Sequence, residues 1–301
     1  MRPLYLTLCL AFAAPVAPWA PLAPWAPLAP CAPLAPCAPL APLAPCAPLA
    51  PLESAAEIAR RVQDRDTGRD SRAELRMKLF DRRGRVRDRA LTLVTLRGRG
   101  NPGAAATAPD GDRLLMRFTY PSDIRGTGFL VWEHPKGDDE RFLYLPSLGR
   151  VRRIAGTEAQ ESFVGSDFSY EDIGGREFDD YTYALVDENA SWPSPDGSGR
   201  PAWRLESTRK DASVQYPRVV SLVLKDSYVV VQAEMFNRRN EREKAYSVGE
   251  LRQVQGIWTV LQSAMTNAIE KTRTELQVAK IEYNTGLKED AFTRRELEGS
   301  R

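Results

Sequence analysis

Few side chains in this sequence could do chemistry. The single histidine, His134, stands in the run Trp132-Glu133-His134-Pro135, where an apolar stretch enters a Pro-Gly turn. All four cysteines lie before residue 47, so the rest of the chain has no thiolate to bind a metal or act as a nucleophile. We therefore predict no catalytic residue and no metal site, and we expect His134 to be a solvent-facing loop residue.

Sequence motifs of known enzymes are absent as well. The chain has no nucleophile elbow, phosphate-binding glycine loop, dinucleotide fingerprint or zinc-protease helix. An enzyme that uses only carboxylates is the remaining catalytic alternative, because Asp and Glu are plentiful, yet their abundance does not place two of them together. We predict that the protein is not an enzyme and uses no cofactor.

The densest cluster of polar and aromatic residues is Phe163-Val164-Gly165-Ser166-Asp167-Phe168-Ser169-Tyr170-Glu171-Asp172. This composition suits a loop that lays rings on an apolar surface while its carboxylates bind backbone amides. One interpretation is a working surface at the mouth of a cavity. Another is a strand-connecting turn whose Asp167 and Asp172 pair with Arg152 and Arg153. A calcium loop is a weaker alternative, since the spacing of an EF-hand is absent.

A run of arginines between residues 82 and 99 is the one local basic patch. Within it Arg85, Arg87 and Arg89 would share one face of a strand. The whole chain has 42 Lys+Arg against 40 Asp+Glu, and no aromatic residues interleave with these arginines, so we predict no nucleic-acid binding. A solvated hairpin face is the simpler interpretation, and docking on anionic headgroups or an acidic partner is the alternative.

The first 52 residues differ from the rest. Residues 1–17 have a positive start and an apolar core of eleven residues, as in a secretory signal peptide that is too short to span a bilayer. Residues 18–52 approach an Ala-Pro-Xaa repeat, in which regular prolines prevent a helix, so we expect an extended, disordered low-complexity segment. We predict export to the periplasm. An uncleaved tether or a lipid anchor on a cysteine are the alternatives.

Residues 53–301 read as one β-rich domain. Ser54 and Glu57 form a capping-box pattern ahead of a short amphipathic helix. After the helix, apolar residues recur at every second position instead of at helical spacing. About ten short strands separated by Pro, Gly and Asp-rich turns predict an antiparallel meander. Residues 100–111 and 191–201 read as surface insertions, and a last helical turn is expected around Phe292. The strands are expected over residues 73–79, 90–96, 114–119, 128–133, 141–145, 181–186, 203–207, 219–224, 228–236 and 274–283.

Several long motifs in order resemble the LolA-like outer-membrane lipoprotein-sorting family. They are Phe118-Thr119-Tyr120-Pro121-Ser122-Asp123-Ile124-Arg125-Gly126-Thr127-Gly128-Phe129-Leu130-Val131-Trp132, then Phe142-Leu143-Tyr144-Leu145-Pro146-Ser147-Leu148, Arg152-Arg153-Ile154 and the cluster from Phe163 to Asp172. Weaker similarity continues to Phe292-Thr293-Arg294-Arg295-Glu296-Leu297, so the resemblance covers nearly all of residues 53–301.

This resemblance implies a mainly β fold, an incomplete antiparallel β-barrel of the LolA/LolB-like half-barrel type. A short N-terminal helix and a lid of helices or loops would cover its concave apolar face, which would hold acyl chains. The family is similar to a periplasmic carrier of lipoproteins, and members of this branch are suspected of working beside RND-type exporters. A shared fold does not decide the cargo.

We therefore predict a non-enzymatic periplasmic carrier that binds acyl chains of a lipid or lipoprotein and hands them to an acceptor at the outer membrane. Each CH₂ of an acyl chain buried in an apolar groove contributes about 0.8 kcal/mol, so the groove can bind the chain without a covalent bond. As a group, the residues expected to contact lipid are Phe118, Leu130, Trp132, Phe142, Tyr144, Phe163, Phe168, Tyr170 and Trp258.

The alternative is an accessory protein that docks on an RND-type transporter or envelope assembly without carrying lipid. The residues expected to make that docking surface are Arg152, Arg153, Ser166, Asp167, Glu171 and Asp172. The two hypotheses differ in whether a continuous apolar cavity exists.

Overall fold

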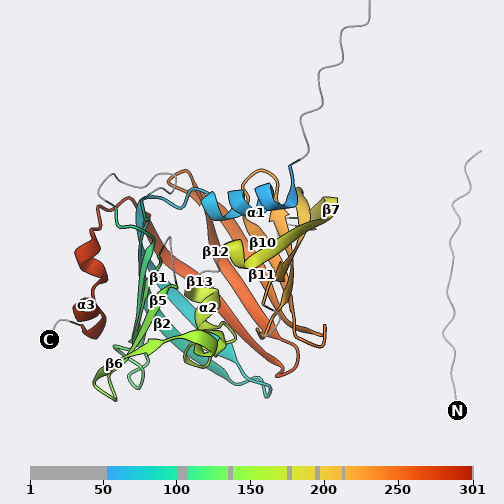
Figure 1. The fold of residues 1–301 in the computed structure, drawn as a ribbon. Coiled ribbons are helices and arrows are strands. Elements are labelled where there is room, and N and C mark those ends of the chain that lie inside the picture. The colour runs from blue at the N-terminus through green and yellow to red at the C-terminus, as the bar shows by residue number, and fades with distance from the viewer. Residues whose placement is uncertain are drawn as a thin grey trace, which may run out of the picture. The chain divides into compact units, whose positions relative to one another are not determined.

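In the computed structural model, thirteen strands of the described residues form one antiparallel sheet (Figure 1). The structure describes residues 53–99, 108–134, 138–174, 178–193, 197–211 and 214–299. The expected signal peptide, residues 1–17, and the expected low-complexity segment, residues 18–52, lie outside the described residues, and all four cysteines lie there too.

The strands follow the chain closely. They are β1 (Asp70–Phe80), β2 (Val86–Leu96), β3 (Arg113–Tyr120), β4 (Gly128–Trp132), β5 (Glu140–Leu145), β6 (Arg150–Ile154), β7 (Tyr181–Pro193), β8 (Gly199–Arg209), β9 (Arg218–Leu224), β10 (Val230–Phe236), β11 (Arg242–Val254), β12 (Ile257–Asn267) and β13 (Thr272–Tyr283). The helices are α1 (Ala55–Asp64), α2 (Tyr170–Gly174) and α3 (Arg294–Glu298), with 3-10 turns η1 (Gly156–Gln160), η2 (Phe163–Gly165), η3 (Phe178–Asp180) and η4 (Glu289–Phe292).

The sheet is an incomplete barrel. Its order is β6-β5-β4-β3-β2-β1-β13-β12-β11-β10-β9-β8-β7, so every neighbour is consecutive in sequence except β1 and β13. That one long-range ladder pairs Ser71 with Tyr283 and Phe80 with Arg273, and it joins the two halves of the meander. β6 and β7 end the order as the two edges. The predicted mainly β, half-barrel fold class is confirmed.

Helix α1 begins where the capping-box pattern predicts. Ser54 Oγ accepts from the Glu57 backbone nitrogen at 3.2 Å, and the Ser54 backbone nitrogen donates to Glu57 Oε2 at 2.7 Å. The helix buries Ile58 and Ala59 against Trp203, Leu205 and Val223 of β8 and β9. Helix α1 is thereby held across one end of the sheet (Figure 1).

The two faces of the sheet bury different clusters. Phe118, Phe129 and Leu143 belong to a cluster that also contains Met235 and Met265, from strands far away in the sheet order. Side chains from such distant strands can meet only on the concave side. The residues of opposite parity on β3–β5, such as Leu130, therefore lie on the convex side.

The sequence did not predict three of the strands, β6, β11 and β12. The first reads Arg-Val-Arg-Arg-Ile, and β11 and β12 carry register shifts at Glu250 that break the alternation of apolar and polar residues. The prediction that 191–201 is a surface insertion was wrong. Residues 191–193 and 199–201 continue the β7–β8 ladder, in which Trp192 pairs with Arg200 and is buried.

Candidate functional site

The concave side of the sheet holds an apolar cavity of about 610 Å³. Strands β2, β3, β10, β11, β12 and β13 supply most of its walls, and α1 and α2 close it from two sides. Most of the lining side chains are apolar, because every second residue of each strand points inward, to the concave face. The lining is Val62, Arg65, Leu93, Leu114, Met116, Phe168, Asp172, Ile173, Val229, Val230, Ala233, Met235, Tyr246, Val260, Ser263, Met265 and Leu276.

A second apolar hollow of about 270 Å³ adjoins this cavity. The two share Val62 of α1 and Val230 and Ala233 of β10, so they lie side by side. The second hollow continues under α1 toward β7–β9, where Tyr183 and Phe178 stack with ring centroids 4.9 Å apart. The two hollows are therefore adjoining apolar spaces beneath the helix.

A third hollow of about 450 Å³ is polar. It shares Val62, Arg65 and Leu114 with the large apolar cavity. The Arg97 guanidinium lies in its wall and donates to the carbonyl oxygen of Arg65 at 3.1 Å and to the hydroxyl of Thr67. Burial lowers the pKa of Arg65, and the positive charge of Arg97 lowers it further.

Residues 163–174, which we call the plug, fill the concave side next to β3–β5. The Phe163 ring lies 5.8 Å from that of Phe118, 5.4 Å from that of Phe129 and 5.5 Å from that of Tyr170, measured between centroids. The plug therefore forms one end of the apolar cavity, and Figure 1 shows α2 on the concave side.

Polar contacts fasten the plug to strands on both sides. Thr274 Oγ1 of β13 donates to Oδ2 of Asp167 at 2.6 Å. Arg89 of β2 donates to the carbonyl oxygen of Val164 at 2.6 Å, and Val164 has a φ of 49°, which is unusual for a β-branched residue. Glu171 forms an ion pair with Arg209 of β8.

These contacts correct two sequence interpretations. Asp167 does not pair with Arg152 or Arg153 but with Thr272 and Thr274, because the plug turns inward toward β13. Arg89 is not on a solvated face. It is buried, because it has the same parity as Leu91 on β2 and points to the concave side.

Of the nine residues expected to contact lipid, four lie on the concave side. Phe118, Phe163, Phe168 and Tyr170 belong to the same buried cluster, and Phe168 lines the large cavity.

Four others lie on the convex face. Leu130, Trp132, Phe142 and Tyr144 pack with Phe292 and Leu297 of the C-terminal segment. Trp258 packs in a further cluster with Trp192, and Arg200 lies 4.6 Å from its ring centroid.

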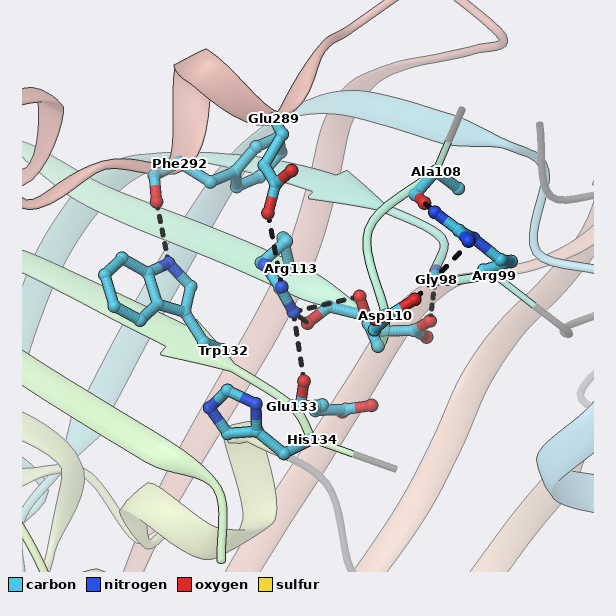
Figure 2. A network of polar contacts seen from close by, with 12 residues as sticks. Gly98, Arg99, Ala108, Asp110, Arg113, Trp132, Glu133, His134, Glu289 and Phe292 are labelled. Atoms are coloured by element: carbon cyan, nitrogen blue, oxygen red, sulfur yellow. Dashed lines mark hydrogen bonds and ion pairs between the residues drawn. The ribbon is translucent and has the colours of Figure 1, made fainter. Parts of the chain in front are cut away.

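The C-terminal segment is held to this convex face by specific polar contacts (Figure 2). Trp132 Nε1 donates to the carbonyl oxygen of Phe292 at 2.7 Å. Arg113 bridges two segments, since it pairs with Glu289 at 3.3 Å and donates to the carbonyl oxygen of Glu133 at 3.0 Å. The expected helical turn around Phe292 is confirmed as η4 and α3.

The six residues expected to dock on a partner differ in exposure. Ser166 and Asp167 are buried, and Glu171 is mostly buried in its ion pair with Arg209. Asp172 accepts from the Ser169 backbone nitrogen at 2.9 Å and lines the cavity. Arg152 and Arg153 are exposed and lie 3.5 Å from Glu158 and 3.8 Å from Glu140.

Sequence reasoning missed the residues at which the hollows meet. The sequence-based candidates did not include Val62 of α1 or Arg65, which follows that helix. They also did not include Val230 and Ala233 of β10. Val62 follows Ile58 at helical spacing, which marks the same face of α1, and this signal was available. The sequence could not show that Val230 points inward, because a register shift next to it in β10 reverses which alternate residues face the cavity.

Across the described ranges, no three His, Cys, Asp or Glu side chains are gathered to hold a metal ion. His134 Nε2 lies 3.4 Å from Glu140 Oε2 at the edge of β5. Within the same ranges, none of the helices has the length and apolar character that a bilayer crossing requires.

The sequence and fold match known proteins. A family model described as an uncharacterized protein matches residues 110–299. A DUF1329 family protein from Desulfovibrio piger is 30% identical, with a TM-score of 0.71 over 81% of this chain and 97% of its own. A putative outer membrane lipoprotein-sorting protein domain from Vibrio parahaemolyticus is also 30% identical, with a TM-score of 0.70 over 81% of this chain and 98% of its own.

A more distant protein of the LolA superfamily from Nitrosomonas europaea has the same fold. It is 16% identical, with a TM-score of 0.58 over 80% of this chain and 98% of its own. None of the curated proteins matches the sequence. The chain therefore belongs to the DUF1329 family, is similar to an outer membrane lipoprotein-sorting protein domain, and has the fold of the LolA superfamily.

Proposed function

We propose that this protein is a non-enzymatic carrier of the cell envelope that holds acyl chains of a lipid or lipoprotein in the cavity beneath α1 and hands them to an acceptor at the outer membrane. The observation that carries the proposal is the pair of adjoining apolar spaces, the cavity of about 610 Å³ and its neighbour of about 270 Å³. The lipoprotein-sorting name of the Vibrio parahaemolyticus relative agrees with it.

The energetics of such a site are favourable. A cavity of this size lies within the range of about 300–1,000 Å³ that is usual for small-ligand sites. Each CH₂ group moved from water into it contributes about 0.8 kcal/mol, so a chain of twelve to sixteen carbons is held firmly without a covalent bond. Release into water would be slow, and transfer therefore requires an acceptor or an opening of the site.

The test is to purify the full chain without detergent, extract it with organic solvent and identify the extract by lipid mass spectrometry. Native mass spectrometry gives the stoichiometry of the same sample. We expect an acyl lipid in stoichiometric amount. A protein that is free of lipid and also fails to take up a fluorescent fatty acid would contradict the proposal.

A variant that fills the cavity tests the position of the chain. Val230→Trp places an indole between the two apolar hollows, where Val230 lines both. Uptake of the fluorescent fatty acid should fall, while Ala184→Trp, at an exposed position of β7, should bind as the original protein does. Equal binding by both variants would place the acyl chain elsewhere.

The proposal also includes export through residues 1–17, with residues 18–52 following as a segment outside the carrier domain. The mature protein recovered from the envelope should then lack the first 17 residues. The intact mass of that protein decides the point, since a retained signal or an attached lipid would each give a different mass.

A further inference from the structure

We propose that the cargo is an anionic amphiphile, whose phosphate headgroup binds Arg65 and Arg97 in the polar hollow while its acyl chain occupies the adjoining apolar cavity. This inference rests on the proposed carrier function and names the chemical class of its ligand. It is carried by the way a polar and an apolar hollow meet at one arginine.

The first observation is continuity. Arg65 follows the last turn of α1 and lines both the polar hollow of about 450 Å³ and the apolar cavity of about 610 Å³. Val62 and Leu114 line both hollows as well. A ligand with a charged head and a hydrocarbon tail can therefore place each part in a matching environment across this junction.

The second observation is uncompensated positive charge. Arg97 is 8% exposed and donates to neutral acceptors, namely the hydroxyl of Thr67 and the carbonyl oxygens of Gln63 and Arg65. Its Nε is buried and has no hydrogen-bond partner. A buried charge without a counter-ion is costly, so an anion that reaches this place is bound favourably.

Arg65 adds a second cation to the same wall. In the part of the chain that the structure describes, neither Arg65 nor Arg97 forms an ion pair, and the neighbouring Asp66 carboxylate acts on Arg65 as a smaller influence than burial. The depressed pKa of Arg65 has burial as its main cause, and the nearness of Arg97 contributes. The Arg97 guanidinium reaches the Arg65 carbonyl oxygen and both residues line the same hollow, so two arginines border the place where a phosphate would bind through charge-assisted hydrogen bonds.

Three carboxylates line the polar hollow, and each has its own partners. Asp139 forms an ion pair with Arg141 at 2.8 Å. Asp112 accepts from the Gly98 backbone nitrogen at 2.6 Å, and Asp112 and Glu133 each make further polar contacts. The third arginine of the hollow, Arg113, pairs with Glu289. Arg65 and Arg97 therefore remain as the cations available to a ligand.

The test uses the full chain, freed of bound lipid, and displacement of the neutral fluorescent probe N-phenyl-1-naphthylamine. The two competitors are dodecyl phosphate and dodecyl maltoside, which share a chain and differ in headgroup charge. We expect dodecyl phosphate to compete better, and Arg65→Gln to weaken it by about tenfold without changing dodecyl maltoside. Raised salt should weaken dodecyl phosphate alone.

Matched variants control for folding and for general charge. Arg65→Lys keeps the positive charge and should restore part of the preference, while Arg76→Gln, at an exposed position on β1, should have no effect. Melting curves of all variants establish that they are folded, and the unchanged dodecyl maltoside affinity of Arg65→Gln shows an intact cavity.

The outcomes separate the two proposals. If both amphiphiles displace the probe equally and Arg65→Gln changes neither, the headgroup site is overturned while the carrier function stands. If neither amphiphile binds the original protein, the carrier function itself fails. If inorganic phosphate alone at millimolar concentration displaces dodecyl phosphate, the two arginines bind the phosphate group as proposed, and if dodecanoate matches dodecyl phosphate, the preference for phosphate is overturned.

Discussion

Thr274 holds Asp167 by two hydrogen bonds. Its Oγ1 donates to Asp167 Oδ2 at 2.6 Å and lies 2.9 Å from the Asp167 backbone nitrogen, which donates to it. Thr274 is completely buried in β13, and Asp167 belongs to the plug, 107 residues earlier in the chain. Thr274 thus helps to hold the segment that forms one end of the apolar cavity.

Removal of this carboxylate should loosen the plug. Asp167→Ala leaves the hydroxyls of Thr272 and Thr274 without their acceptor, and we expect a loss of about 1–3 kcal/mol in the free energy of unfolding. Urea unfolding measures it. The matched control is Asp88→Ala, at an exposed position of β2, which should change stability by less than about 0.5 kcal/mol. Equal losses in both variants would contradict the assigned role.

Substitution at Gly128 should displace the C-terminal segment from the convex face. A Cβ atom at Gly128 would lie 2.7 Å from Leu297 Cδ1 and 3.1 Å from the Leu297 carbonyl oxygen, so Gly128→Ala should cost about 1–3 kcal/mol. Trypsin should then cleave faster at Arg294 and Arg295. Gly249→Ala is the control, because its Cβ would meet Gln262 Cβ at an ordinary 3.5 Å.

The capping box should control how firmly α1 covers the cavity. Ser54→Ala removes the acceptor for the Glu57 backbone nitrogen and should cost about 1 kcal/mol. Hydrogen exchange of the α1 amides should speed up while exchange in β1 stays as it was. Ser54→Asn retains a capping side chain and should exchange almost as slowly as the original protein, and a rate equal to that of Ser54→Ala would argue against the cap.

Acid should weaken the same helix end. The hydrogen bonds from the backbone and the hydroxyl of Ser54 lower the pKa of Glu57 below its usual 4.5. A lowered pKa means that the stabilisation is present in full above about pH 4.5 and is lost as the pH falls through the lowered value. Hydrogen exchange of α1 measured across this range should show the transition.

The variant Glu57→Gln separates the titration of this residue from general acid effects. Glutamine keeps the hydrogen bond of the capping box but does not titrate. Exchange of α1 in this variant should be flatter between about pH 5 and pH 3 than in the original protein. An identical pH profile in both proteins would show that another group controls the helix end.

Local patterns in the sequence determined a large part of the fold. The capping box at Ser54, the alternation in β1 and β2 and the turn at Phe292 depend on neighbours within a few residues, so each could be predicted without knowing what packs against it. The motifs between residues 118 and 172 carried the family resemblance, and with it the incomplete barrel.

Tertiary structure alone decided which face of β3–β5 meets the cavity. Leu114, Leu115 and Met116 are all apolar, as are Phe129 and Leu130, so alternation cannot distinguish the inner face from the outer one. The direction in which the sheet curls and the return of Leu297 onto the convex side make that distinction.

The polar end of the site could not be predicted from local sequence patterns either. Arg65 and Arg97 are 32 residues apart, and they meet because β1 and β2 bring the end of the hairpin back beneath α1. In the sequence, each arginine by itself is typical of an ordinary surface residue. What makes the pair distinctive is that Arg97 is buried without an ion pair beside the partly buried Arg65. Burial is a property of the assembled sheet and helix, because it depends on every segment that excludes water from the same place.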